Sequence, residues 1–172
     1  VKDYANDIYT DAIRLHQMVT NLLDVEQMKQ GKMPLQKEWV DMNTLLTTIV
    51  THLEPVSTHH TLRLSLDEKL SQLEGDPEKL RQAIMNLLSN AIKYSPNGGD
   101  ILIKSSREGE AVHVSIQDHG TGIAPEFIEA IFTPYHRVNS STTRYIQGAG
   151  LGLSLVREII LLHEGKIWVD SI

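Results

Sequence analysis

Residues 86–96 read NLLSNAIKYSP and place two asparagines, four residues apart, inside an otherwise apolar helical pattern. Asparagine is a poor helix former because its side-chain amide competes for nearby backbone groups. Glutamate, lysine or glutamine would propagate an exposed helix face better. Asn86 and Asn90 therefore mark either a plain solvent face or a site for a metal and a phosphate, and the helix alone does not distinguish the two.

The helix that carries these asparagines has clear limits in the sequence. Asp76 is a good cap, Pro77 suits the first helical position, and the turn residues 95–99 stop the helix at about Tyr94. Lys93 lies with the asparagines on one side, and the apolar face opposite consists of Leu80, Ile84, Leu87, Leu88 and Ala91. Amide oxygens are hard, neutral ligands that suit Mg²⁺ when it also binds substrate phosphates, whereas a carboxylate would repel a triphosphate.

The remaining pattern predicts an α+β fold. Alternating apolar residues predict strands over residues 35–42, 61–66, 100–108, 111–119 and 166–172. Helical patterns predict helices over residues 43–54, 77–94, 125–131 and 151–165, the first capped by Asp41 or Asn43. The turn at residues 108–110 joins two strands into a hairpin. We expect a two-layer α/β sandwich, with one mixed sheet and helices on one face.

The first thirty residues predict a long amphipathic helix that ends near Gly31 and Pro34. Its apolar stripe consists of Ile8, Ala12, Leu15, Val19 and Leu22, widened by Tyr4, Met18, Val25 and Met28. A single helix cannot bury such a stripe alone. The helix either packs onto its own domain or joins a bundle with a second helix or chain, and its position before a short linker favours the bundle.

Composition excludes several classes of protein. The net charge of −6 argues against a nucleic-acid binder, which would show a basic patch. Without cysteine there is no disulfide, thiolate catalysis or cysteine-based zinc site. The apolar runs are shorter than a membrane span and the first residues do not resemble a signal peptide. We therefore expect a soluble piece without membrane contact of its own.

Two glycine-rich segments follow the asparagine helix. The first, Asp118-His119-Gly120-Thr121-Gly122-Ile123, ends a predicted strand. A buried carboxylate there would need a donor such as the exocyclic amine of a purine, and Gly120 and Gly122 would let the backbone approach a flat base. The bland interpretation is a plain Asp-Gly turn.

The second segment, Gly148-Ala149-Gly150-Leu151-Gly152-Leu153, precedes a helix, so its N–H groups suit phosphates. Its spacing matches neither the dinucleotide fingerprint nor the Walker pattern. Between the two glycine segments lies Phe132-Thr133-Pro134-Tyr135-His136-Arg137, in which Arg137 either binds a phosphate oxygen or is an ordinary surface charge. Each of these signals is weak when taken alone. The order of the segments along the chain is the stronger evidence.

Taken in order, Asn-x-x-x-Asn-x-x-Lys-Tyr, Asp-x-Gly-x-Gly-Ile, Phe-x-Pro-Tyr-x-Arg and Gly-x-Gly-Leu-Gly-Leu closely resemble the N box, first glycine box, F box and second glycine box of sensor histidine kinases. The resemblance is to that family's catalytic ATP-binding domain, of the Bergerat fold, and covers about residues 33–172. It divides the chain into residues 1–31, which resemble the second helix of the dimerisation and phosphoacceptor hairpin, and residues 32–172.

The resemblance implies a set of roles. Asn90 would coordinate Mg²⁺ with Asn86 beside it, and Asp118 would accept from the adenine amine. Residues 136–150 would form a mobile ATP lid. The full implied ATP-binding set is Asn86, Asn90, Lys93, Tyr94, Asp118, Gly120, Gly122, Ile123, Arg137, Gly148, Gly150, Leu151 and Gly152. Implied partners are a response regulator receiver domain and a second copy through the N-terminal helix. The implied location is the cytoplasm, with a parent protein that is either membrane-anchored or free.

Asn86 separates the possible reactions. Gyrase-type and chaperone-type relatives of this fold carry a water-activating glutamate at this position, and an asparagine cannot act as a general base. Asn86 therefore favours phosphoryl transfer to a histidine over a slow ATPase. Two further functions are compatible with the sequence, a non-catalytic nucleotide sensor and a module whose main role is dimerisation.

The sequence also departs from the family pattern. None of the eight histidines has the acceptor context His-Glu/Asp-x-x-x-Pro. No residue of this chain is therefore assigned as catalytic, and we expect no autophosphorylation by it alone. We also expect the family's last strand to be missing.

Overall fold

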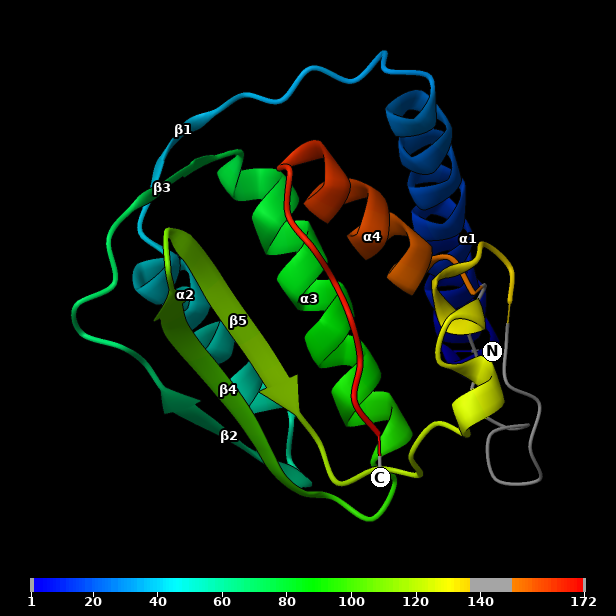
Figure 1. Cartoon of the computed structure of the whole chain (residues 1–172). Coiled ribbons are helices and arrows are strands. Elements are labelled where there is room, and N and C mark those ends of the chain that lie inside the picture. Colours follow the sequence, from blue (N-terminus) through cyan, green and yellow to red (C-terminus); the bar gives the residue numbers. More distant parts are fainter. Residues whose placement is uncertain (1, 137–149, 172) are drawn as a thin grey trace.

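The computed structural model describes residues 2–136 and 150–171 and confirms the α+β fold (Figure 1). Its elements in chain order are α1 (Lys2–Lys29), β1 (Glu38–Val40), α2 (Met42–Leu53), η1 (Glu54–Val56), β2 (His60–Ser65), β3 (Leu73–Gly75), α3 (Pro77–Tyr94), β4 (Gly99–Glu108), β5 (Ala111–Gln117), η2 (Pro125–Phe127), η3 (Ala130–Phe132) and α4 (Gly152–Leu162). The predicted limits of the asparagine helix, residues 77–94, are confirmed.

Strand pairing divides the expected single sheet in two. The larger sheet is mixed and has the order β2-β4-β5, with β2 parallel and β5 antiparallel to β4. Among the strands that the structure describes, the short β1 and β3 pair with each other alone, antiparallel. The sequence does not predict β3, because three residues directly before a helix cap carry no alternation to detect. Gly109, with φ of 64°, closes the predicted hairpin between β4 and β5.

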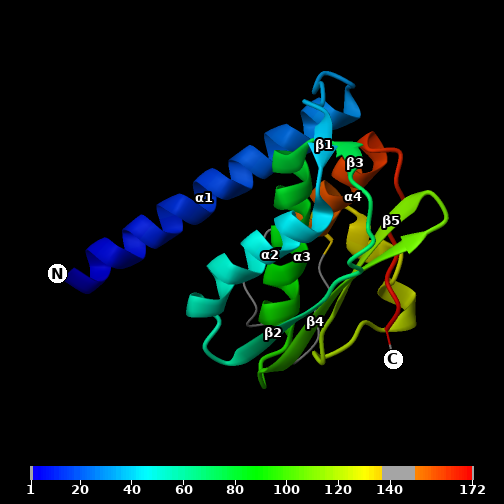
Figure 2. The ribbon, with the colours of Figure 1, turned by 90° about the vertical axis from the view of Figure 1, so that its left-hand side faces the viewer.

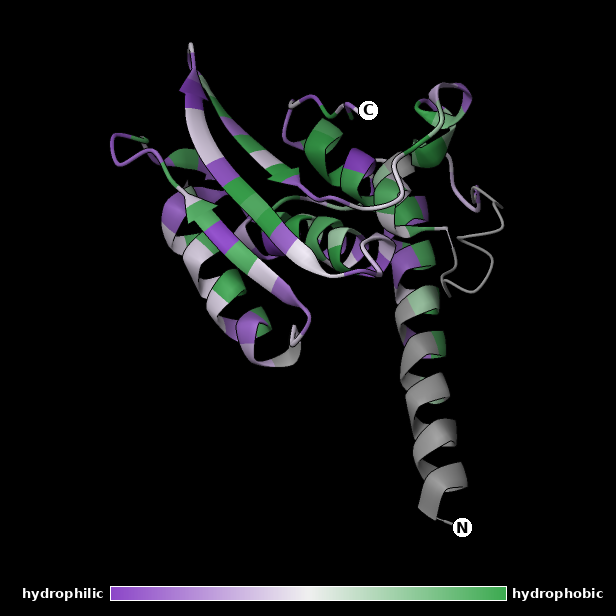
Figure 3. Ribbon diagram, turned by 90° about the horizontal axis from the view of Figure 1, so that it is seen from below, coloured by the Kyte–Doolittle hydropathy of each residue, from purple (hydrophilic) through white to green (hydrophobic). Residues whose placement is uncertain are grey.

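The main core lies between the larger sheet and the helices on one of its faces. Ile101 and Ile103 of β4 are fully buried against Leu46 and Ile49 of α2 and Leu88 of α3. Hydrophobic and hydrophilic residues alternate along β2 and β5 (Figure 3), and along β4 buried residues alternate with more exposed ones. This alternation sends one side of each strand into the core and the other to solvent. The sandwich thereby fixes α3, which carries the asparagines.

The C-terminal end of α1 packs onto the same domain. Val25 and Met28 are buried with Leu155 and Ile159 of α4 in a second core. Asp24 accepts hydrogen bonds from Gln82 Nε2 at 3.0 Å and from Lys79 Nζ at 3.4 Å. The rest of the helix projects away (Figure 2), and there Leu15 and Val19 are 63% and 49% exposed. One part of the helix therefore packs onto its own domain. In the other part, the apolar side chains of Leu15 and Val19 remain exposed.

Two predicted elements at the end of the chain are wrong. Residues 125–131 form the separate turns η2 and η3 instead of one helix. Residues 166–171 lie extended, but no backbone hydrogen bond joins this described segment to a strand. Alternation of apolar residues predicts which side of an extended segment is buried. It does not predict whether a neighbouring strand forms backbone hydrogen bonds with that segment.

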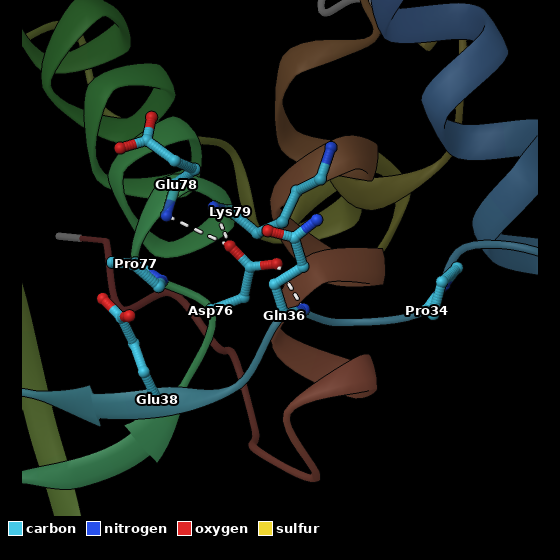
Figure 4. A pocket seen from close by; sticks show the side chains of 7 residues that line it. All are labelled: Pro34, Gln36, Glu38, Asp76, Pro77, Glu78 and Lys79. Carbon is cyan, nitrogen blue, oxygen red and sulfur yellow. Dashed lines mark hydrogen bonds between the residues drawn. The ribbon is translucent and has the colours of Figure 1, made fainter.

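The start of α3 is held by Asp76, which is only 7% exposed. Its carboxylate accepts hydrogen bonds from the backbone N–H groups of Glu78 and Lys79, both at 3.1 Å, and of Gln36 at 2.9 Å. Figure 4 shows these bonds beside a surface hollow of about 290 Å³. Burial by itself would raise the pKa of this carboxyl, but the three N–H donors and the nearby His163 outweigh it and hold the pKa below 3.8.

Asp76→Asn is expected to lower the free energy of unfolding by about 1–2 kcal/mol near neutral pH, because an amide cannot accept at both positions. Because the folded pKa is lowered, this contribution is present above the unfolded pKa of about 4 and is lost as pH falls through the folded value. Urea unfolding of both proteins should therefore show their difference shrinking in acid.

The matched control is Asp41→Asn at the cap of α2, where the carboxylate accepts only from Thr44 N at 3.0 Å among the described residues. Asparagine caps a helix about as well as aspartate, so this variant should change stability little. A difference between wild type and Asp76→Asn that stays constant from neutral pH into acid would contradict the assignment.

Candidate nucleotide-binding site

The N-terminal end of α4 lies directly against the asparagine face of α3. A Cβ on Gly152 would lie 3.0 Å from Asn86 Oδ1 and 4.0 Å from Asn90 Nδ2. Only glycine permits this approach without displacing the Asn86 amide. The second glycine segment and the two asparagines, more than sixty positions apart in sequence, thus form one surface.

The two asparagines differ in how they are held. Asn86 Nδ2 donates to Gln82 O at 2.9 Å, which turns Oδ1 toward Gly152. Asn90 is half-buried, and its amide makes no hydrogen bond to any residue the structure describes. A half-buried amide that makes no hydrogen bond to these residues is available to bind a ligand.

The first turn of α4 presents N–H groups without a side-chain cap. Leu151 is the cap residue, and no described side chain bonds the free N–H groups behind it. The Leu151 side chain is 4% exposed, so this residue can offer a ligand only its backbone. Gly150, with φ of 69°, receives a hydrogen bond on its carbonyl from Tyr135 N at 2.9 Å, which ties the F-box segment to the second glycine segment. An uncapped helix N-terminus beside two amides suits a phosphate group.

The first glycine segment meets the C-terminal end of α3, one turn beyond Asn90. Thr121 N donates to Tyr94 O at 3.1 Å, and a Cβ on Gly120 would lie 2.4 Å from that same oxygen. Gly122 has φ of 68°, a left-handed conformation that favours glycine. Both predicted glycines therefore have a structural requirement at their positions.

Asp118 is exposed, so the expectation of a buried carboxylate is wrong: β5 ends at Gln117, one residue before it. Its Oδ1 accepts from Gly120 N at 2.8 Å and from Ser95 Oγ at 3.5 Å. Both of these donors reach Oδ1, which leaves Oδ2 for a ligand donor. The plain Asp-Gly turn and the binding role are thus compatible.

The other residues of the implied ATP-binding set lie either at the end of α3 or outside the described residues. Lys93 Nζ, in the last turn of α3, lies 5.8 Å from the centre of the Tyr94 ring. Arg137, Gly148 and nearly all of the implied lid lie outside the described residues. Sequence reasoning missed Ser95, which is 2% exposed and bonds Asp118, because a serine after a helix end carries no signal of its own.

Two surface hollows lie away from this site. One is the hollow at the start of α3, and the second, of about 300 Å³, is lined by Asp24, Glu78, Lys79, Arg81, Gln82 and Met85. Within residues 2–136 and 150–171, no three histidine, aspartate or glutamate side chains gather in a way that could hold a metal. A metal at the α3–α4 surface would therefore depend on amide and phosphate oxygens.

An α/β sandwich whose asparagine helix touches both glycine segments defines an ATP-binding domain of the Bergerat fold. The chain belongs to the family of histidine kinase-, DNA gyrase B- and HSP90-like ATPases, whose profile matches residues 75–172. Within that family its resemblance to the ATP-binding domain of sensor histidine kinases is confirmed.

Three similar proteins illustrate the relationship. Sensor histidine kinase WalK of Bacillus subtilis is 32% identical over 162 residues, 92% of this chain and 26% of the relative. Adaptive-response sensory kinase SasA of Thermosynechococcus vestitus is 37% identical over 160 residues, 90% of this chain and 41% of the relative. The structure of histidine kinase ThkA in complex with response regulator protein TrrA matches with a TM-score of 0.74 at 27% identity, over 97% of this chain and 46% of that one.

The chain thus spans only 26% and 41% of the length of these two curated relatives. Among the described helices, none combines the length and hydropathy needed to cross a membrane.

Proposed function

We propose that this chain is the ATP-binding catalytic part of a two-component sensor histidine kinase. In this role it presents the γ-phosphoryl group of ATP to a histidine outside residues 1–172, for onward relay to a response regulator receiver domain. The observation that carries the proposal is the close approach of Gly152 to the side-chain amides of Asn86 and Asn90, because it joins an uncapped helix N-terminus to two amides in one surface.

Mg²⁺ fits this surface by the chemistry of its donors. Asn90 offers an amide without a partner among the described residues, and the orientation of Asn86 directs an oxygen to the same place. Magnesium is bound in proteins by a few oxygen ligands together with substrate phosphates, and would neutralise phosphate charge there. The first-turn N–H groups of α4 and the Lys93 ammonium would add further positive potential.

Adenine fits beside the C-terminal end of α3, one to two turns beyond the asparagines. Asp118 Oδ2 would accept from the exocyclic amine, since Oδ1 already receives Gly120 N and Ser95 Oγ. The backbone of residues 120–123 would lie against the base, where Gly120 and Gly122 keep side chains out of the way. The last two turns of α3, from Asn86 to Tyr94, would then separate the phosphate end of the site from its base end by about 6–12 Å.

The chemistry favours transfer to a protein histidine over hydrolysis. An imidazole nitrogen is itself the nucleophile, and the domain supplies position and charge neutralisation. Hydrolysis needs a group to activate water, and the amide of Asn86, already donating to Gln82 O, cannot do this. A slow ATPase is therefore the less favoured function.

The exposed part of α1 supports a second part of the proposal. Leu15 and Val19, together with Leu23 at 54% exposure, form an apolar surface that runs from the projecting part of the helix to the edge of its packed end. We assign residues 1–31 to the dimerisation hairpin of the parent protein, where a second copy would cover this surface. Residues 32–172 would form the catalytic domain.

Incubation of the chain with γ-labelled ATP, Mg²⁺ and a separately prepared acceptor domain tests the proposal. Acid-labile phosphohistidine should form on the acceptor domain and not on this chain. The control is an acceptor domain in which the phosphorylated histidine is replaced by alanine. Release of inorganic phosphate without any transfer would favour the ATPase, and nucleotide binding with neither reaction would favour a nucleotide sensor.

A further inference from the structure

The extended segment of residues 166–171 lies beside the first glycine segment although the two are far apart in sequence. In Figure 1 it runs back from α4 across α3 and ends next to the loop that follows β5. At that point Ile123 N donates a hydrogen bond to Ser171 Oγ at 2.8 Å. This contact reaches the residue that closes the proposed base end of the site.

Two further contacts hold this segment in place. The ring of Trp168 stacks on the ring of His113 in β5, with centroids 5.2 Å apart and planes 5° apart. His113 Nδ1 in turn lies 3.2 Å from Glu108 Oε1 on the neighbouring strand. Ile167 packs against the second core, which includes α4. Side chains, rather than a backbone ladder, therefore attach the segment.

The first glycine segment needs such an anchor at its far end. Its near end is tied by the hydrogen bonds of Gly120 N to Asp118 and of Thr121 N to Tyr94 O. Beyond them Gly122 is a flexible residue in a left-handed conformation, and Ile123 follows it. Ser171 supplies the hydrogen bond that fixes Ile123 relative to Asp118.

We propose that Ser171, held by the stacking of Trp168 on His113, is a positioning residue for adenine recognition by the segment of residues 118–123. The inference rests on the proposed function. Ser171 does not touch the phosphate end at Asn86, Asn90 and Gly152, so its effect should depend on the base and not on the phosphates. In particular, it should act on the interaction between Asp118 and the exocyclic amine.

The test compares ATP with inosine triphosphate, which lacks that amine, by equilibrium binding to the whole chain with Mg²⁺. Ser171→Ala should weaken ATP binding by about threefold to tenfold, the range for one net hydrogen bond, and change inosine triphosphate binding by less than about twofold. Ser171→Thr, which keeps the hydroxyl, should bind ATP with an affinity close to that of the wild type. Ser65→Ala, an exposed serine on β2, is the matched control and should change neither affinity.

A second variant tests the anchor. Trp168→Ala should lower ATP affinity in the same base-dependent way, and Trp168→Phe, which can still stack, should largely retain it. Both residues act through one segment. The double variant should therefore bind ATP with about the same affinity as whichever single variant binds it less tightly. Additive losses, equal losses for both nucleotides, or no loss for Ser171→Ala would overturn the inference. Failure of wild type to bind ATP would instead overturn the proposed function on which it rests.

Discussion

Asn90→Ala is expected to weaken Mg-ATP binding by about tenfold or more, equivalent to at least ~1.4 kcal/mol. The amide of Asn90 makes no bond to the described protein residues, and it lies beside Gly152 at the uncapped start of α4. Removing it deletes an oxygen ligand from a site that offers the metal few others. Calorimetric titration with ATP, with and without Mg²⁺, measures the loss, which should largely disappear when the metal is absent.

The fold of the Asn90→Ala variant should be intact. Alanine is a better helix former than asparagine, so the free energy of unfolding should stay unchanged or rise by about 0.5 kcal/mol. Ser89→Ala is the matched control, because Ser89 is the exposed neighbour of Asn90 on α3 and should leave nucleotide binding unchanged. Undiminished, Mg²⁺-dependent ATP binding by Asn90→Ala would remove this residue from the metal site.

Gly120→Ala is expected to damage both the site and the fold. The added Cβ would lie 2.4 Å from Tyr94 O and 2.8 Å from Asp118 Oδ1, so the backbone of the first glycine segment must move. That shift breaks the hydrogen bond of Thr121 N to Tyr94 O and displaces Asp118 from its donors. We expect a loss of about 1–3 kcal/mol in unfolding free energy, and an ATP affinity lower by about tenfold or more.

Gly109→Ala provides the control for Gly120→Ala. Gly109 has φ of 64°, a left-handed conformation that disfavours alanine. No atom of the described residues, however, lies within 4 Å of the added Cβ. It should cost about 1 kcal/mol of stability through backbone strain and leave ATP affinity unchanged. If the two variants lost stability and affinity in equal proportion, the contact with Tyr94 O would have no specific role.

Local signals in the sequence are enough for most of the secondary structure. Asp76 and Pro77 predict the start of α3, and the turn residues after Tyr94 predict its end, because caps and breakers act within one helical turn. The same reasoning fails for residues 166–172, where alternation is present but the described residues offer no partner strand. It fails also for β3, which exists only because β1 lies beside it.

For the site, the sequence by itself determined which residues carry the chemistry: the amides on α3, the carboxylate after β5 and the glycines before α4. Residue type and order are sufficient for this, because amide, carboxylate and glycine each have a restricted set of uses. Only the tertiary structure decided that α3 contacts both glycine segments, that Asp118 is exposed and accepts from Ser95, and that Ser171 contacts Ile123. These contacts join residues 23 and 48 positions apart, and in the case of Gly152 and the asparagines more than sixty. Packing of the sandwich brings such residues together, and no local pattern encodes it.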